Sequence, residues 1–247
     1  MLDLLVKTYA ARQLAAAALA VALAAPLAFI GTSTARPGAS VAGPIGGAII
    51  GRVTVIDGDT IHFEDVKVRL EGIDAPESSQ TCLTVTGHTW PCGSVATREL
   101  ERMIGRSEVR CDNRGTDKYG RMLGICFVGA LEINAEMVRR GMAWAFVKYS
   151  QAYVTIEAEA RARRVGIWQG HAQPAWDFRA GRWHVAQAKA PAGCAIKGNV
   201  TRTERIYHMP WSPWYDKIRM DGSDSGKRWF CSEVEALQAG WRPVTAR

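Results

Sequence analysis

Hydrophobic and polar residues alternate in the first half of the chain with the period of two that is typical of strands with one buried face. In the run from residue 66 to 71 (VKVRLE), this alternation places Arg69 on the polar face. Residues 49–57 and 60–64 predict two earlier strands, joined by an Asp-Gly-Asp turn that is a strong hairpin signal. Pro76 biases the residue before it toward an extended backbone, so we expect the third strand to end there.

The next part of the sequence predicts three helices, with a pair of strands between the first and the second. Ser94 is the expected N-cap of a helix that reaches Ile104, and Gly105 is its expected C-cap. The other predicted elements are strands at 107–112 and 121–128 and helices at 132–141 and 151–164. Five strands and three helices in this order predict an α+β, mainly β, fold in which a small closed barrel packs beside its helices.

Composition and charge limit the class of protein. A hydrophobic fraction of 47% in 247 residues indicates a globular chain rather than a disordered one. The net charge of +7 is uneven, because residues 49–179 hold 17 basic and 17 acidic residues, whereas residues 180–247 hold 11 and 6. The central region therefore has no net positive charge that would attract nucleic acid. Attraction by net charge is expected only from residues 180–247.

The N-terminal segment has the charge pattern of an export signal. Lys7 and Arg12 precede residues 14–30, which are uncharged and rich in Ala and Leu. This run is at the short end for a membrane span, so the sequence leaves open a cleaved signal peptide or an uncleaved anchor over residues 1–35. Residues 36–48 are expected to be a linker, and the rest of the chain is expected to be exported, either periplasmic or secreted.

The chain has six cysteines, and an even number indicates disulfides if the compartment is oxidising. Pairing of nearest neighbours is the simplest of the possible connectivities. The alternative is buried free thiols, but the export signal favours bridges. The predicted pairs are Cys82–Cys92, Cys111–Cys126 and Cys194–Cys231.

Acidic and arginine side chains fall where the predicted strands end or turn. Asp59, Asp74 and Glu77 offer carboxylate oxygens, the ligands that hard divalent cations prefer. Arg69 and Arg121 offer planar guanidinium groups, which can each hold two phosphate oxygens. Singly, each residue has a structural explanation, such as a turn or a surface ion pair. Together they predict a metal-dependent site for phosphodiester cleavage.

Five short motifs occur in a fixed order and, taken together, resemble the staphylococcal-nuclease-like, or thermonuclease, family. The resemblance covers residues 49–179. It implies an OB-type five-stranded barrel with three helices and a Ca²⁺-dependent nuclease acting on DNA and/or RNA. It also implies 3′-phosphorylated products. The motifs are IDGDT (56–60), VRLEGIDAPE (68–77), TDKYGR (116–121), MVRRGMA (137–143) and GIW (166–168).

The resemblance assigns roles to the acidic motif residues. It implies that Asp59, Asp74 and the main-chain carbonyl of Ala75 bind the calcium ion. It gives Glu77 the role of general base and places Asp57 close to the metal. The family usually has threonine where this chain has Ala75, and a main-chain ligand tolerates that change.

The resemblance also assigns the substrate-binding side chains. Arg69 and Arg121 correspond to the phosphate-binding arginines, and Lys118 and Tyr119 to positions beside the substrate phosphate. Tyr149 corresponds to one of two tyrosines that line the nucleotide pocket. The second of these is Val147 here, beside Phe146, so nucleotide stacking is expected to be weaker. The lysine-rich loop of the family is replaced here by one with two cysteines, which leaves substrate preference open.

The C-terminal part predicts a linker at 180–193 and a small module at 194–247. Strands are predicted at Arg205–His208 and Lys217–Met220, and Ser232 starts a capping box for a short helix. A module this small usually needs a covalent staple, which its cysteine pair would provide.

Three interpretations of this module stay open. Its tryptophans and basic residues could bind single-stranded nucleic acid or an anionic envelope polymer, or the tryptophans could form the module's small core. A zinc site from Cys194, Cys231 and His208 matches no standard spacing.

The sequence as a whole predicts an exported, monomeric, calcium-dependent nuclease with no protein partner. The alternative is a catalytically inactive OB-fold protein that binds nucleic acid or envelope polymer. A third reading is an envelope-associated protein in which the nuclease site is incidental.

Overall fold

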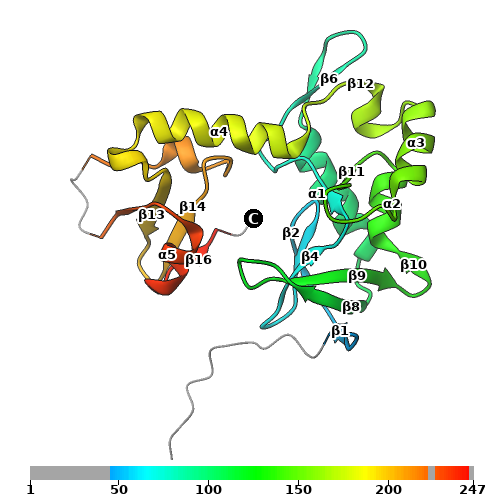
Figure 1. Ribbon diagram of the computed structural model, residues 1–247, viewed down its shortest axis with the longest axis horizontal. Coiled ribbons are helices and arrows are strands. Elements are labelled where there is room, and N and C mark those ends of the chain that lie inside the picture. Colours follow the sequence, from blue (N-terminus) through cyan, green and yellow to red (C-terminus); the bar gives the residue numbers. More distant parts are fainter. Residues whose placement is uncertain (1–44, 222–225, 245–247) are drawn as a thin grey trace, which may run out of the picture. The chain divides into compact units, whose positions relative to one another are not determined.

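The computed structural model describes residues 45–221 and 226–244, which lie in one compact unit, 39–247 (Figure 1). The uncharged run at 14–30, predicted as signal or anchor, lies outside the described residues. None of the helices within the described ranges is long and apolar enough to cross a bilayer.

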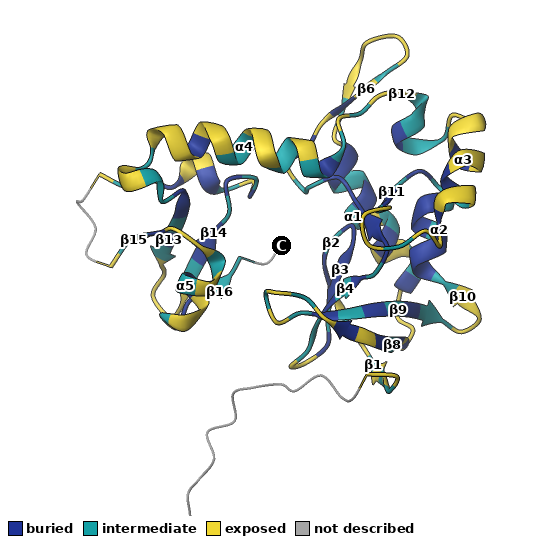
Figure 2. Ribbon diagram, viewed as in Figure 1, coloured by how far each residue is buried: buried dark blue, intermediate teal, exposed yellow. Residues whose placement is uncertain are grey.

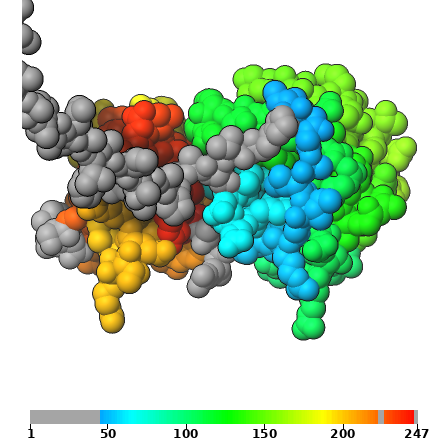
Figure 3. Space-filling view, turned by 90° about the horizontal axis from the view of Figure 1, so that it is seen from below, coloured from blue at the N-terminus to red at the C-terminus, as the bar shows by residue number. Residues whose placement is uncertain are grey.

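A seven-stranded mixed sheet forms the centre of the fold. Its strand order is β1-β8-β9-β4-β3-β2, with β10 paired to β9. All pairs are antiparallel except β4 with β9. In Figure 3 the blue and cyan atoms that begin the described part of the chain lie against green atoms, in keeping with the β1–β8 pairing. The strands are β1 (Ala48–Gly51), β2 (Thr54–Asp57), β3 (Thr60–His62), β4 (Lys67–Leu70), β8 (Val109–Thr116), β9 (Met122–Val128) and β10 (Leu131–Glu132).

Three helices cover this sheet and close its core. Their inward side chains join the strands in one buried cluster that includes Ile61, Leu70, Leu100, Met122 and Met137. Much of the ribbon of the central strands and of α1 and α2 is accordingly coloured as buried in Figure 2. This curled sheet with its helices confirms the predicted mixed α/β, OB-like class. Closure of the sheet into a five-stranded barrel stays a prediction. The helices are α1 (Cys92–Ile104), α2 (Ile133–Arg139) and α3 (Val154–Ala162).

Two local predictions are wrong. Helix α1 begins at Cys92, after Pro91, and the hydroxyl of Ser94 donates to the carbonyl of Ser78 at 3.3 Å instead of capping the helix. Proline suits a helix start because it has no N–H to leave unpaired. The predicted strand at 217–220 is also absent from the described chain, where η3 (Tyr215–Lys217) is a 3₁₀ turn.

Two glycines from separate motifs meet where α2 and α3 end. A Cβ on Gly166 would lie 2.1 Å from the carbonyl oxygen of Gly141, and a Cβ on Gly141 would lie 2.3 Å from that of Val165. Both glycines have positive φ, and the N–H of Ile167 donates to the Gly141 carbonyl at 2.8 Å. Only glycine permits this close approach of two chain segments.

Three small pairings hold the remaining segments of the nuclease-like region. β5 (Ile73–Asp74) pairs with β11 (Trp144–Ala145), and β6 (Cys82–Thr84) pairs with both β7 (Thr89–Trp90) and β12 (Gly170–His171). The turn η1 (Gly166–Gln169) precedes β12.

All three predicted disulfides are present. Cys82–Cys92 closes the loop before α1, and Cys111–Cys126 joins directly opposed residues of β8 and β9. Cys194–Cys231 closes a loop in the C-terminal module. None of the six cysteines is a free thiol.

A long helix, α4 (Ala175–Lys189), follows the nuclease-like region, so residues 180–189 of the expected linker are helical. After the turn η2 (Pro191–Gly193), a four-stranded sheet forms in the order β15-β13-β14-β16. Its core contains Ile196, Tyr207, Phe230 and Trp241. The elements are β13 (Ile196–Val200), β14 (Arg205–His208), β15 (Arg228–Phe230), α5 (Glu233–Gln238) and β16 (Arg242–Pro243). Ser232 caps α5 as predicted, accepting from the N–H of Glu235.

Candidate active site

Three strands bring one arginine against two buried aspartates. Asp59 precedes β3, Arg69 lies opposite Thr60 in the β3–β4 register, and Asp74 ends β5. Arg69 forms an ion pair with Asp59 through one nitrogen and donates to Asp74 Oδ1 at 2.6 Å through the other. Asp74 is fully buried and Asp59 nearly so. One guanidinium therefore holds the two carboxylates side by side.

Backbone contacts fix the two aspartates further. The N–H of Ala75 donates to Asp59 Oδ2 at 2.7 Å, and the N–H of Asp59 donates to Asp57 Oδ1 at 3.1 Å. A Cβ on Gly58 would lie 2.7 Å from that of Ala75, so the turn can approach this strand end only with glycine. The predicted acidic residues and the main chain of Ala75 thus meet at one place.

Glu77 lies beside this group and contacts an arginine that the sequence analysis did not single out. Arg179, on α4, donates to Glu77 Oε1 at 2.7 Å and to Asp74 at 2.8 Å (Oδ2) and 3.1 Å (Oδ1). Burial raises the pKa of Glu77 to about 7, with Arg179 opposing the shift and Asp57 adding to it. A carboxylate with a raised pKa is a stronger base.

The loop that holds Cys82 and Cys92 fixes the backbone of Glu77. The Glu77 N–H donates to Gln80 Oε1 at 3.2 Å, and the Gln80 N–H donates to the Glu77 carbonyl at 2.7 Å. A Cβ on Gly93 would lie 1.7 Å from that carbonyl oxygen, so the start of α1 packs directly on it. The Cys82–Cys92 disulfide closes the same loop.

Arg121 reaches the same cavity from the turn between β8 and β9. It pairs with Asp117 at 2.7 Å, and Asp117 also accepts from the N–H of Tyr119. The guanidinium of Arg121 and the ammonium of Lys118 both lie over the Tyr119 ring, 5.4 and 4.8 Å from its centroid. The turn therefore presents two cations and one aromatic face together.

One cavity of about 660 Å³ connects these groups. Its lining includes Tyr149, which is 67% exposed and packs edge-on against Phe146 with ring centroids 4.9 Å apart. The predicted site residues on the wall are Asp57, Asp59, Arg69, Ala75, Glu77, Lys118, Tyr119, Arg121 and Tyr149. Asp74 lies directly behind, in contact with Arg69 and Arg179. The C-terminal module adds Tyr207, Met209, Trp211, Ser212, Pro213, Trp214 and Glu233 to the wall.

Comparison with known proteins identifies the fold that carries this site. A family described as "Staphylococcal nuclease homologue" matches residues 67–170. Protein ParB of Escherichia coli is 37% identical over 158 residues, which cover 56% of this chain and 84% of that protein. Micrococcal nuclease of Shigella flexneri is 36% identical over 146 residues, 51% of this chain and 78% of that protein. The chain belongs to the staphylococcal nuclease family.

A third relative carries a different kind of name. The succinoglycan biosynthesis protein ExoI of Rhizobium meliloti (strain 1021) is 34% identical over 137 residues, which cover 54% of this chain and 72% of that protein. Nuclease names and the family match nevertheless identify this chain as a nuclease, a hydrolase whose substrate is nucleic acid. The alternative of an inactive OB-fold binding protein is therefore not favoured.

Residues of the first three motifs meet at one cavity, whereas the MVRRGMA and GIW motifs meet each other outside its lining. Arg179 is the site residue that sequence reasoning missed. It lies beyond the segment matched by the family, in a stretch where the expected domain ended. A signal was present, because Trp176, Arg179 and Trp183 recur at helical spacing.

The oxygen groups suit a hard cation, although the described residues contain no cluster of three or more His, Cys, Asp or Glu side chains arranged for a metal. The predicted ligand set has only two carboxylates, completed by a main-chain carbonyl. Asp59, Asp74 and Glu77 converge on the positive charges of Arg69 and Arg179. When all three acids are ionised, two guanidinium groups leave one negative charge uncompensated, which favours a further cation.

Proposed function

We propose that this nuclease is an exported enzyme that uses Ca²⁺ to hydrolyse phosphodiester bonds of DNA and/or RNA. One observation supports this above the others: Asp59, Asp74, Glu77 and Arg69 form a single contact network on a cavity that Arg121 also lines. These are the groups that the family resemblance assigns to catalysis, and they come from separate parts of the chain.

Asp59, Asp74 and the carbonyl of Ala75 would hold the ion. Bound there, Ca²⁺ supplies positive charge against the phosphate and orients it for in-line attack. Asp57 would support the ligands through its bond to the N–H of Asp59.

The protein's own side chains account for the rest of the chemistry. Glu77 is suited to take the proton of the attacking water, because burial makes its carboxylate more basic. Arg69 and Arg121 would bind phosphate oxygens and stabilise charge that grows during attack. Lys118 and Tyr119 would contact the neighbouring phosphate. The family resemblance implies a 5′-hydroxyl leaving group and a 3′-phosphorylated product.

A chelator experiment tests this function directly. The purified chain should degrade DNA or RNA in the presence of Ca²⁺ and lose that activity in excess chelator, with recovery when Ca²⁺ is restored. End-labelled products should carry 3′-phosphate and 5′-hydroxyl ends. Equal activity with and without chelator would contradict the metal assignment, and 5′-phosphate ends would contradict the mechanism.

The module's aromatic residues carry a separate prediction. Trp211 and Trp214 line the cavity rather than the module's core, and Ser79 donates to the Trp211 carbonyl at 2.7 Å. Stacking on a base is worth about 1–3 kcal/mol per base. Replacing both tryptophans with alanine should therefore raise KM for single-stranded substrate about tenfold or more, with kcat nearly unchanged. An unchanged KM would assign these side chains to packing alone, like the contact of Trp211 with Trp183, whose ring centroids lie 6.3 Å apart.

The remaining proposals concern the whole chain. We propose residues 1–35 as signal or anchor, 36–48 as linker, 49–179 as the nuclease region and 194–247 as the C-terminal module of a monomer. The uncharged run at 14–30 and the disulfides favour export to the periplasm or medium. Cell fractionation with N-terminal sequencing of the exported form tests both export and signal cleavage.

A further inference from the structure

Helix α4 brings a third arginine to the site and holds it there rigidly. Ala175 is fully buried, and Trp176 stacks on Phe146 with ring centroids 5.6 Å apart and planes 8° from parallel. Trp176 also meets Trp144 edge-on at 6.0 Å. Arg179 is one turn further along the same helix face as these anchored residues. Its position beside Asp74 is therefore set by packing rather than by a flexible loop.

Arg179 occupies the carboxylate oxygens that the ion would need. Both of its terminal nitrogens bind Asp74, and one of them also binds Glu77. Asp74 Oδ1 accepts from Arg69 as well, so neither oxygen of this buried carboxylate lacks a guanidinium partner. Buried, charge-assisted and bidentate contacts of this kind are among the strongest hydrogen bonds in proteins.

We propose that Arg179 is a built-in competitor of the divalent cation, holding Asp74 and Glu77 in the metal-free protein and lowering the affinity for the ion. This inference rests on the proposed function, because it takes Asp74 as a metal ligand. An ion that binds Asp74 must displace at least one guanidinium contact and accept a nearby positive charge. By linkage, a bound ion weakens the Arg179 contacts by the same factor by which those contacts weaken ion binding.

The test is calcium titration of the full exported chain by isothermal calorimetry, without substrate. Arg179→Gln removes the charge and should tighten Ca²⁺ binding on the order of tenfold, a typical size for coupling between sites. The metal-free variant should also melt at a lower temperature, because Asp74 keeps only its Arg69 contact and Glu77 loses its guanidinium partner. Ca²⁺ should raise its melting temperature more than that of the wild type.

Arg182→Gln is the matched control. Arg182 lies three residues further along α4 and bonds the Pro210 carbonyl at 2.9 Å and Asp216 at 2.7 Å, so within the described residues its bonds go to the C-terminal module rather than to Asp74 or Glu77. Its loss should leave calcium affinity unchanged. If Arg179→Gln does not fold, Arg179→Met keeps the apolar stem and gives the same comparison.

The outcomes separate this inference from the proposed function. If the wild type binds calcium and Arg179→Gln binds it equally or more weakly, the role of Arg179 is overturned and the proposed function is not. Absence of binding in both proteins overturns the calcium assignment as well. Binding by the variant alone supports the competition in its strongest form.

Discussion

Replacing Glu77 with glutamine should lower kcat for phosphodiester hydrolysis by about 10²-fold or more, the usual contribution of a positioned general base. Glutamine keeps the size of the side chain and its carbonyl can still accept from Arg179, so the local packing should persist. What it loses is the ability to take a proton. Initial rates at saturating substrate and Ca²⁺ measure the effect, and circular dichroism with thermal melting checks the fold.

The matched control for this variant is Glu159→Gln. Glu159 is an exposed carboxylate on α3, outside the cavity, so its loss changes net charge equally without touching the site. Its rate should equal that of the wild type. Full activity of Glu77→Gln would remove the carboxylate from the mechanism and leave the metal and the arginines to activate water.

The sequence predicted those features of the fold that depend on interactions between residues close together in the chain. The Asp-Gly turn before Asp59, the polar-facing Arg69 and the Ser232 cap depend on neighbouring positions, and the structure has all three. The disulfides followed from proximity in the chain. Convergence of Asp59, Asp74 and Arg121 is different, because no local pattern brings distant turns together. That expectation came from the resemblance to the family.

The errors also have physical reasons. Ser94 has the right chemistry for an N-cap, but Pro91 and the packing of Gly93 on Glu77 start α1 earlier. Residues 180–189 of α4 were predicted as linker because few of their apolar side chains are buried, with Trp183 and Ala186 as the ones that pack on the C-terminal module. A helix without a continuous apolar stripe has a weak sequence signal. Arg179 was missed because it lies at the end of the predicted nuclease region, beyond the motifs that carry the family resemblance.

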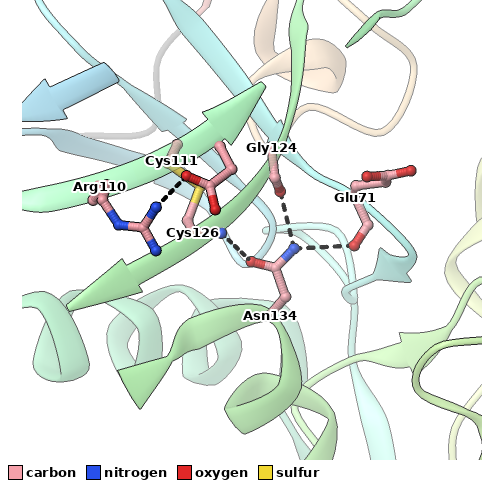
Figure 4. Close-up of a disulfide and its surroundings, with 7 residues drawn as sticks. Glu71, Arg110, Cys111, Gly124, Cys126 and Asn134 are labelled. Carbon is pink, nitrogen blue, oxygen red and sulfur yellow. Dashed lines mark hydrogen bonds and ion pairs between the residues drawn. A yellow bond between two sulfur atoms is a disulfide. The ribbon is translucent and has the colours of Figure 1, made fainter. Parts of the chain in front are cut away.

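We expect the largest effect on stability from the replacement of one buried asparagine. Asn134, on α2, has no exposed surface and makes three hydrogen bonds of 3.0 Å (Figure 4). Its Oδ1 accepts from the N–H of Cys126, and its Nδ2 donates to the carbonyls of Gly124 and Glu71. It therefore ties α2 to β9 and to the chain leaving β4, beside the Cys111–Cys126 disulfide.

Asn134→Leu should lower the free energy of unfolding by about 3 kcal/mol or more, because it removes partners from buried main-chain groups, at about 1–3 kcal/mol for each group left unsatisfied. For a domain of this size the melting temperature should fall by roughly 10 °C. Urea and thermal denaturation with the disulfides intact measure this loss of stability.

The matched control is Gln151→Leu, at an exposed side chain with one bond to the Val147 carbonyl, which should change stability little. If Asn134→Leu is as stable as the wild type, water or a shifted backbone must satisfy the main-chain groups that the asparagine bonds. The asparagine would then not be needed to join α2 to the sheet.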